Sequence, residues 1–228
     1  MLSFRTTEYN GCACKYSPFY DNKLAIATSA NYGLVGNGKL YILTIQDNGQ
    51  ITQDSAFETQ DGLFDVAWSE LHENQMLASS GDGTISLFDF TLPDFPIMKF
   101  KEHQREVFSV NWNLVEKSMF CSASWDGSVK VWSPVRGQSL MTLVSPRKDQ
   151  RHSSHIDLGG SFTGAAGPDG AKGLVPTPKG GGNNMSLPLS TSKPTVPNPI
   201  NDCVYQATFS PHDPSTLISV NSSSHYQV

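Results

Sequence analysis

The sequence predicts an all-β protein that is assembled from repeated units of about four strands each. Three observations support this fold class. Short apolar runs are separated by Gly, Asn and Asp, and sequence elements recur in the same order at a constant interval. No window of ten or more residues shows the 3.6-residue apolar period of a helix.

The predicted strands are short apolar runs that end at turn residues. Asn-Gly or Asp-Gly pairs at residues 37–38, 82–83 and 126–127 favour tight turns, because Gly adopts the left-handed backbone that such turns need. The clearest strands are residues 39–45, 85–88, 107–112 and 129–132.

Two sequence elements repeat 44 residues apart. Phe64–Trp68 resembles Phe108–Trp112, and Ser80–Phe88 resembles Ser124–Trp132 at the same interval. Because both elements recur in the same order, they indicate a structural repeat and not a chance similarity. Further copies stand at Asn37–Leu43, Cys12–Pro18 and Tyr205–Pro211.

A period near 44 residues with four strands per unit is typical of WD-repeat blades, which close into a β-propeller. We expect blade one at residues 9–57, blade two at 58–100 and blade three at 101–144. In blade three we expect a buried set of hydrogen-bonded side chains, since an unpaired buried polar atom costs about 1–3 kcal/mol. The predicted members of this set are His103, Ser124, Asp126 and Trp132.

After blade three the composition changes. Residues 145–200 are rich in Gly and Pro and poor in aromatic residues, so we expect a disordered loop there. Residues 201–228 begin a fourth blade, and its pattern ends after a second strand at 217–220. We therefore expect about three and a half blades of a seven-bladed, incomplete propeller, and a chain that is a fragment of a longer protein.

Composition argues against several function classes. The formal net charge of −5 does not suit a general nucleic-acid binder. No apolar run approaches the roughly 20 residues of a membrane helix, and the N-terminal residues show no secretory signal. The four cysteines are too few and too scattered for a disulfide framework, so we expect a reducing compartment. They also lack zinc-type spacing, so we expect no metal, and we expect no cofactor.

The sequence does not predict an enzyme. It contains neither a Gly-x-Ser-x-Gly elbow nor a phosphate-binding loop. His103 and Asp126 could form a catalytic pair, with Ser122 or Ser124 as the nucleophile. The same residues suit the internal hydrogen-bond set of the blade, so we predict a structural role for them and no catalytic residue.

Five segments carry a resemblance to one family. They resemble the receptors for the type-2 peroxisomal targeting signal, which are WD-repeat proteins, and they are Tyr16–Asn22, Tyr32–Gly38, Gln60–Trp68, Lys101–Trp112 and Ser122–Trp132. The resemblance covers residues 9–144 and 202–220. The Gly/Pro-rich loop is larger than the connection that usually stands there in this family.

The resemblance implies a soluble cargo receptor. Members of this family bind newly made enzymes through an N-terminal amphipathic helix that carries an Arg and later a His or Gln. A co-receptor closes over that helix, and the complex meets a docking complex at the peroxisomal membrane. We therefore expect a receptor that cycles between the cytoplasm and the peroxisome matrix, without nucleic-acid binding or membrane insertion. The alternative is a generic WD-repeat scaffold of another protein complex.

A basic amphipathic helix needs carboxylates and an apolar floor on one rim of the propeller. A charge-assisted hydrogen bond between the cargo Arg and a part-desolvated carboxylate contributes about 1.5–3 kcal/mol. Asp61 and Asp65 could instead cap backbone N–H groups, and Glu106 could be solvated. Phe64 and Phe108 could instead be buried between blades. The predicted cargo-binding residues are Asp61, Asp65, Glu106, Phe64, Phe108 and Trp125.

Overall fold

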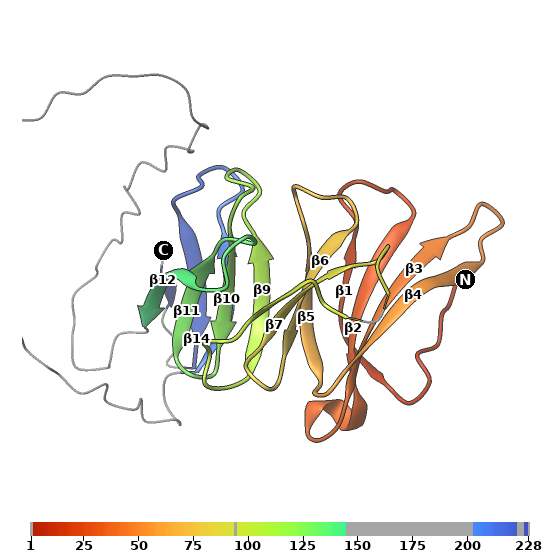
Figure 1. Ribbon diagram of the computed structural model, residues 1–228, viewed down its shortest axis with the longest axis horizontal. Coiled ribbons are helices and arrows are strands. Elements are labelled where there is room, and N and C mark those ends of the chain that lie inside the picture. Colours follow the sequence, from red (N-terminus) through yellow and green to blue (C-terminus); the bar gives the residue numbers. More distant parts are fainter. Residues whose placement is uncertain (1, 94, 145–202, 223–225, 228) are drawn as a thin grey trace, which may run out of the picture. The chain divides into compact units, whose positions relative to one another are not determined.

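The computed structural model describes residues 2–93, 95–144, 203–222 and 226–227, which form four antiparallel sheets (Figure 1). In every sheet the strands pair in chain order. Sheet one holds β1 (Asn10–Tyr16), β2 (Lys23–Ser29), β3 (Gly38–Ile45) and β4 (Ile51–Thr59). Sheet two holds β5 (Leu63–Trp68), β6 (Gln75–Ser80), β7 (Ile85–Asp89) and β8 (Met98–Phe100). Sheet three holds β9 (Val107–Trp112), β10 (Phe120–Ser124), β11 (Ser128–Trp132) and β12 (Ser139–Val144), and sheet four holds β13 (Val204–Phe209), β14 (Leu217–Asn221) and β15 (Tyr226–Gln227).

The predicted all-β class is confirmed. The four clearest predicted strands correspond to β3, β7, β9 and β11. Among the described residues, the helical content is one four-residue segment, η1 (Ala30–Gly33), and no helix there has the length and hydropathy of a membrane span. The loop predicted at 145–200 lies outside the residues that the structure describes.

Two of the three predicted glycine turns are confirmed. Gly83 and Gly127 have positive φ angles of 83° and 84°, which glycine adopts at no steric cost. The predicted turn at Asn37–Gly38 is wrong, because Gly38 is the first residue of β3 and a longer loop, residues 30–37, joins β2 to β3. This loop passes against the start of the next sheet, where a Cβ atom on Gly62 would lie 3.5 Å from the Cα of Gly33.

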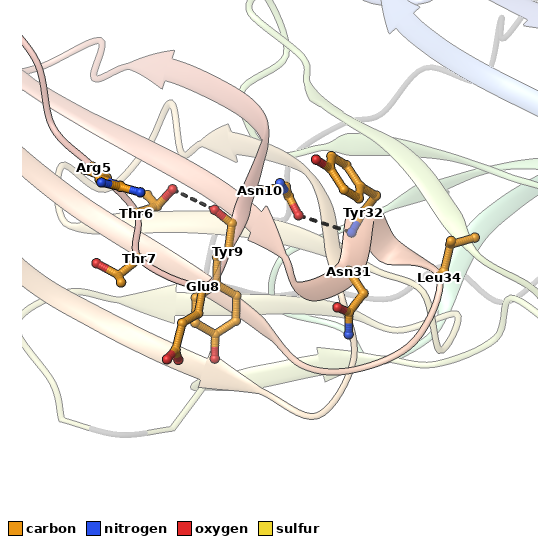
Figure 2. A pocket seen from close by; sticks show the side chains of 9 residues that line it. All are labelled: Arg5, Thr6, Thr7, Glu8, Tyr9, Asn10, Asn31, Tyr32 and Leu34. Atoms are coloured by element: carbon orange, nitrogen blue, oxygen red, sulfur yellow. Dashed lines mark hydrogen bonds between the residues drawn. The ribbon is translucent and has the colours of Figure 1, made fainter.

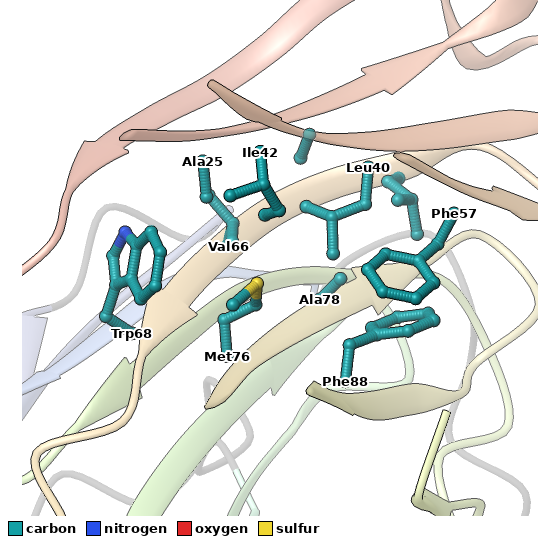
Figure 3. Close-up of a cluster of buried hydrophobic side chains, with 11 residues drawn as sticks. Ala25, Leu40, Ile42, Phe57, Val66, Trp68, Met76, Ala78 and Phe88 are labelled. Atoms are coloured by element: carbon teal, nitrogen blue, oxygen red, sulfur yellow. The ribbon is translucent and has the colours of Figure 1, made fainter. Parts of the chain in front are cut away.

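Apolar side chains fill the space between successive sheets. The first cluster joins sheets one and two, and in it the rings of Phe57 and Phe88 have centroids 4.8 Å apart (Figure 3). The second joins sheets two and three, where the rings of Phe100 and Trp132 lie 5.5 Å apart. A third cluster joins sheets three and four. Each cluster contains side chains from two adjacent sheets, which is how the blades of a β-propeller pack.

Hydrogen bonds also link each sheet to the next, and several of them join first strands. The indole N–H of Trp68 donates to Lys15 O (3.0 Å), the N–H of Val110 donates to Asp65 Oδ2 (3.0 Å), and the N–H of Phe209 donates to Asn111 Oδ1 (3.0 Å). The strands β1, β5, β9 and β13 are therefore fixed relative to one another, which positions the residues at their ends.

The buried polar set of blade three contains Ser122 where we expected Ser124. His103 Nδ1 lies 2.8 Å from Asp126 Oδ2, and His103 Nε2 lies 2.7 Å from Ser122 Oγ. The indole N–H of Trp132 donates to the same Ser122 oxygen at 2.8 Å. Ser124 sits at the end of β10, where its hydroxyl accepts the N–H of Asp126 (3.1 Å). The two serines lie on one face of the strand, so sequence spacing alone does not separate them.

Sheet four has a third strand that the sequence pattern did not reveal. β15 pairs with β14 through Ser219–Gln227 and Val220–Tyr226. The prediction that this unit ends after its second strand is therefore wrong. A strand of two residues is too short to show the alternation on which strand prediction depends.

Candidate functional site

Three of the predicted site residues stack into one aromatic row. The ring centroids of Phe64 and Phe108 lie 4.5 Å apart, and those of Phe108 and Trp125 lie 4.4 Å apart, with nearly parallel planes. Phe64 and Phe108 are each the second residue of the first strand in their sheets, so packing sheet two against sheet three brings the rings together. All three side chains are partly buried, which leaves part of each accessible to a partner.

Tyr205 extends this site, and the sequence analysis did not select it. Its ring meets Phe108 edge-on at 6.4 Å and Trp125 at 6.0 Å. Tyr205 is the second residue of β13, the position that Phe64 and Phe108 occupy in their strands, so the repeat alignment contained the signal. A cavity of about 370 Å³ is lined by residues of the first strands of all four sheets, including Cys12, Phe64, Phe108 and Tyr205.

Asp61 stands in the loop before β5, beside the Phe64 end of the aromatic row. Its Oδ1 accepts the N–H of Gly62 at 2.7 Å, so Asp61 does cap a backbone N–H group. Its Oδ2 accepts no hydrogen bond from the described residues. One carboxylate oxygen of Asp61 can therefore receive a donor from a ligand.

Glu106 stands before β9, at the Trp125 end of the row. The main-chain oxygen of Glu106 accepts the N–H of Trp125 at 3.0 Å, which ties the two residues together. The guanidinium of Arg105 lies 3.4 Å from the Glu106 carboxylate and 5.5 Å from the centre of the Trp125 ring. Carboxylate and indole thus already hold a guanidinium between them, so this position suits an arginine side chain.

Asp65 is engaged within the protein. Its Oδ1 accepts the N–H of Val66 at 2.9 Å, and its Oδ2 accepts that of Val110, on the neighbouring sheet. Burial raises the pKa of the Asp65 carboxyl, although the hydrogen bonds from Val110 and Val66 act against this shift. The contacts favour the structural interpretation of Asp65, as a link between sheets two and three, over direct contact with cargo.

Trp125 has one unusual polar atom. Its indole N–H is buried, and no described residue accepts a hydrogen bond from it. An unpaired buried donor costs about 1–3 kcal/mol, and such groups often stand at functional positions.

The Ser122–His103–Asp126 arrangement has the connectivity of a catalytic triad without its accessibility. With Asp126 accepting from Nδ1, His103 Nε2 is the acceptor for the Ser122 hydroxyl, and Ser122 also accepts from Trp132. Ser122 has no exposed surface. Because a nucleophile must meet its substrate, this set stabilises the blade and does not form an active site. The described residues also contain no group of three or more His, Cys, Asp or Glu that could hold a metal ion.

Comparison with known proteins identifies both the repeat and its relatives. The model "WD domain, G-beta repeat" matches residues 95–133. The chain is 52% identical over 230 residues to the peroxisomal targeting signal 2 receptor of Komagataella phaffii, covering all of this chain and 56% of the relative. It is 46% identical to the receptor of the same name from Saccharomyces cerevisiae, covering 99% of this chain and 53% of that protein. The chain thus spans about half the length of these curated relatives.

More distant proteins match shorter stretches. The human peroxisomal targeting signal 2 receptor is 40% identical over 140 residues, which are 61% of this chain and 43% of the receptor. A chain in a crystal structure of the mitotic checkpoint complex superposes with a TM-score of 0.51 at 17% identity, covering 62% of this chain and 41% of that one. At this identity the likeness shows the fold alone.

Proposed function

This chain is homologous over its whole length to the peroxisomal targeting signal 2 receptors, and from that premise we propose that it binds the N-terminal type-2 targeting signal of cargo enzymes. On the resemblance described above, the signal is an amphipathic helix that carries an arginine. In the bound state its arginine reaches the carboxylates of Asp61 and Glu106, and its apolar side rests on the aromatic row.

The position of Arg105 is the observation that carries this proposal. Its guanidinium already lies between Glu106 and Trp125, which is the environment that a cargo arginine requires. Arg105 and Glu106 are each about one-third exposed, so the pair between them is weak and can be exchanged. A cargo arginine that displaces Arg105 would gain a charge-assisted hydrogen bond without building a new pocket.

The partners in this proposal are cargo enzymes, an import co-receptor and a docking complex at the peroxisomal membrane. The receptor would carry its cargo from the cytoplasm to the peroxisome and return. Its role is binding and not catalysis, which the inaccessible Ser122 and the receptor names of the relatives support.

The proposal is tested by titrating a labelled type-2 signal peptide against the chain, with fluorescence anisotropy as the readout. We expect replacement of the peptide arginine by glutamine to weaken binding. Asp61→Asn and Glu106→Gln should each weaken the wild-type peptide by about tenfold, since each removes a charged acceptor. Arg105→Gln should strengthen binding by roughly two- to fivefold, because it removes a cation that competes for the Glu106 carboxylate.

Glu70→Gln is the matched control. Glu70 pairs with Lys117 at 3.5 Å and follows the opposite end of β5, so its loss should leave peptide affinity unchanged. Binding that ignores the peptide arginine would contradict the receptor proposal and favour a generic scaffold. Unchanged affinity in both Asp61→Asn and Glu106→Gln would refute the assigned residues.

A further inference from the structure

The loop between β2 and β3 presents apolar side chains that the described residues leave uncovered. Tyr32, Leu34 and Val35 are 80%, 84% and 75% exposed. Single exposed apolar residues are common, but three of them within four positions form a contiguous patch, which is typical of an interaction site. We call residues 31–35 the apolar loop.

The backbone of the apolar loop is strained, and specific hydrogen bonds hold it. Asn31 and Tyr32 have φ angles of +47° and +58°, in the left-handed region that is unfavourable for side chains with a Cβ atom. The Asn31 side chain donates to Val35 O at 3.0 Å. The N–H of Tyr32 donates to Asn10 Oδ1 at 3.2 Å, as Figure 2 shows. The loop is thus held in one shape before any partner arrives.

The residues with strained backbone surround one cavity beside this loop. A cavity of about 490 Å³ separates the apolar loop from the segment before β1 (Figure 2). Its walls include Glu8, Asn31 and Tyr32, which are the non-glycine residues with positive φ in the described part of the chain. Strained residues of this kind cluster at ligand contacts, because the surrounding structure must hold them in place.

The apolar loop borders the candidate site. A Cβ atom on Gly33 would lie 2.7 Å from a ring carbon of Phe64, so the loop packs directly against the first ring of the aromatic row. Gly62, which follows Asp61, packs against the same glycine, because a Cβ atom on Gly62 would lie 3.5 Å from the Cα of Gly33. The apolar loop, Asp61 and Phe64 therefore form one continuous surface.

We propose that the apolar loop binds the apolar side of the signal helix, with Leu34 and Val35 as its main contacts. This inference rests on the proposed function and adds a specificity element to the same site. An amphipathic basic helix presents cationic and apolar side chains together. This surface presents the Asp61 carboxylate beside the apolar loop. Because the loop is already ordered, its contacts are made without the entropy cost of ordering a flexible segment.

The chain offers a matched control for this idea. Leu114 and Val115 form a second exposed Leu-Val pair, 50% and 45% exposed, in the loop at the far end of β9 from Glu106. The double variant Leu34→Ser with Val35→Ser should bind the signal peptide about tenfold more weakly, because it removes apolar area that binding would bury. Leu114→Ser with Val115→Ser should bind as the wild type does. Thermal melting of both variants should be unchanged, since all four side chains are exposed.

Changes in the peptide separate the apolar contact from the charged one. Alanine in place of the peptide's apolar side chains should weaken binding to the wild type, but should weaken binding to the Leu34/Val35 variant little further. Glutamine in place of the peptide arginine should weaken binding to both proteins by the same factor. This pattern of coupling in a double-mutant cycle is expected only if the loop and the apolar side of the helix touch.

Three results would overturn the inference. The first is wild-type affinity for the peptide in the Leu34/Val35 variant, and the second is an equal loss of affinity in the Leu114/Val115 variant. The third is a loss of affinity that appears only when a co-receptor is present, which would make the loop a co-receptor contact. A wild-type chain that does not distinguish the peptide with arginine from the peptide without it would refute the proposed function itself. A wild-type chain that does distinguish them, with no effect of the loop variant, would refute this inference alone.

Discussion

Ser122 determines whether the buried polar side chains of blade three are satisfied. Its hydroxyl lies 2.7 Å from His103 Nε2 and accepts the indole N–H of Trp132 at 2.8 Å, and the residue is fully buried. Two side chains from different parts of the blade therefore depend on one oxygen atom. Removal of that oxygen would leave two buried nitrogen atoms without a partner.

We predict that Ser122→Ala lowers the free energy of unfolding by about 1–3 kcal/mol, the cost of leaving buried polar groups unpaired. Urea denaturation followed by tryptophan fluorescence measures this loss. Ser118→Ala is the control, because Ser118 is exposed and its hydroxyl bonds to the Glu116 side chain. It should change stability by less than about 0.5 kcal/mol. A loss in Ser122→Ala no larger than in the control would show that the set does not stabilise the blade.

At the scale of elements, one carboxylate organises the turn between β10 and β11. Asp126 Oδ1 accepts the N–H of Ser128 at 3.0 Å, and Oδ2 accepts that of Gln104 at 3.0 Å. Burial by itself would raise the pKa of Asp126, but the hydrogen bond and charge of His103, with further hydrogen bonds from Ser128 and Gln104, outweigh burial. The pKa therefore lies well below its ordinary value of 3.8.

This low pKa predicts a pH dependence of stability. Because the folded-state pKa is lower than the unfolded one, ionised Asp126 contributes stability that is complete above about pH 5 and is lost as the pH falls through the folded pKa. The urea concentration at the unfolding midpoint should therefore decrease as the pH is lowered from 5 to 3. The midpoint of Asp126→Asn should be lower at pH 5 and should decrease less steeply. The pKa of Asp65 is raised, so its effect on stability changes with pH in the opposite direction. The test therefore compares parent and variant at each pH. Parallel curves would contradict the prediction.

At the scale of the molecule, the blades share their cores and stabilise one another. Phe88 shows this coupling, because it belongs to sheet two but its ring packs against that of Phe57 in sheet one, with centroids 4.8 Å apart. It is 1% exposed and occupies the place that Trp132 holds in blade three. Phe88 therefore replaces a hydrogen-bonding indole by apolar packing between blades.

We predict that Phe88→Ala costs about 3–5 kcal/mol, a large share of the stability of an ordinary domain. Hydrogen exchange should increase in sheets one and two together, because the cavity lies between them. Phe88→Leu should cost less, about 1.5 kcal/mol or below, which keeps the effect measurable if the alanine variant fails to fold. Faster exchange confined to sheet two would contradict the shared core.

Several features followed from the sequence because neighbouring residues encode them. Strand alternation and the Asp-Gly turns are local, and the 44-residue interval placed Phe64 and Phe108 at equivalent positions. Tyr205 stands 97 residues after Phe108, so the interval does not reach it, but the repeat copy at Tyr205–Pro211 contains it. Short or irregular segments carry no such signal, which is why β15 and the loop at residues 30–37 were missed.

The sequence by itself determined the all-β class, the four-stranded units and the order of the strands, because these depend on side-chain alternation and turn chemistry over a few residues. The tertiary structure alone decided that Ser122 and not Ser124 completes the buried set, that Asp65 links two sheets, and that Arg105 lies between Glu106 and Trp125. It also placed the apolar loop against Phe64. These facts depend on which side chains meet when sheets pack, and the identities of residues close together in the chain do not specify contacts between residues far apart in it.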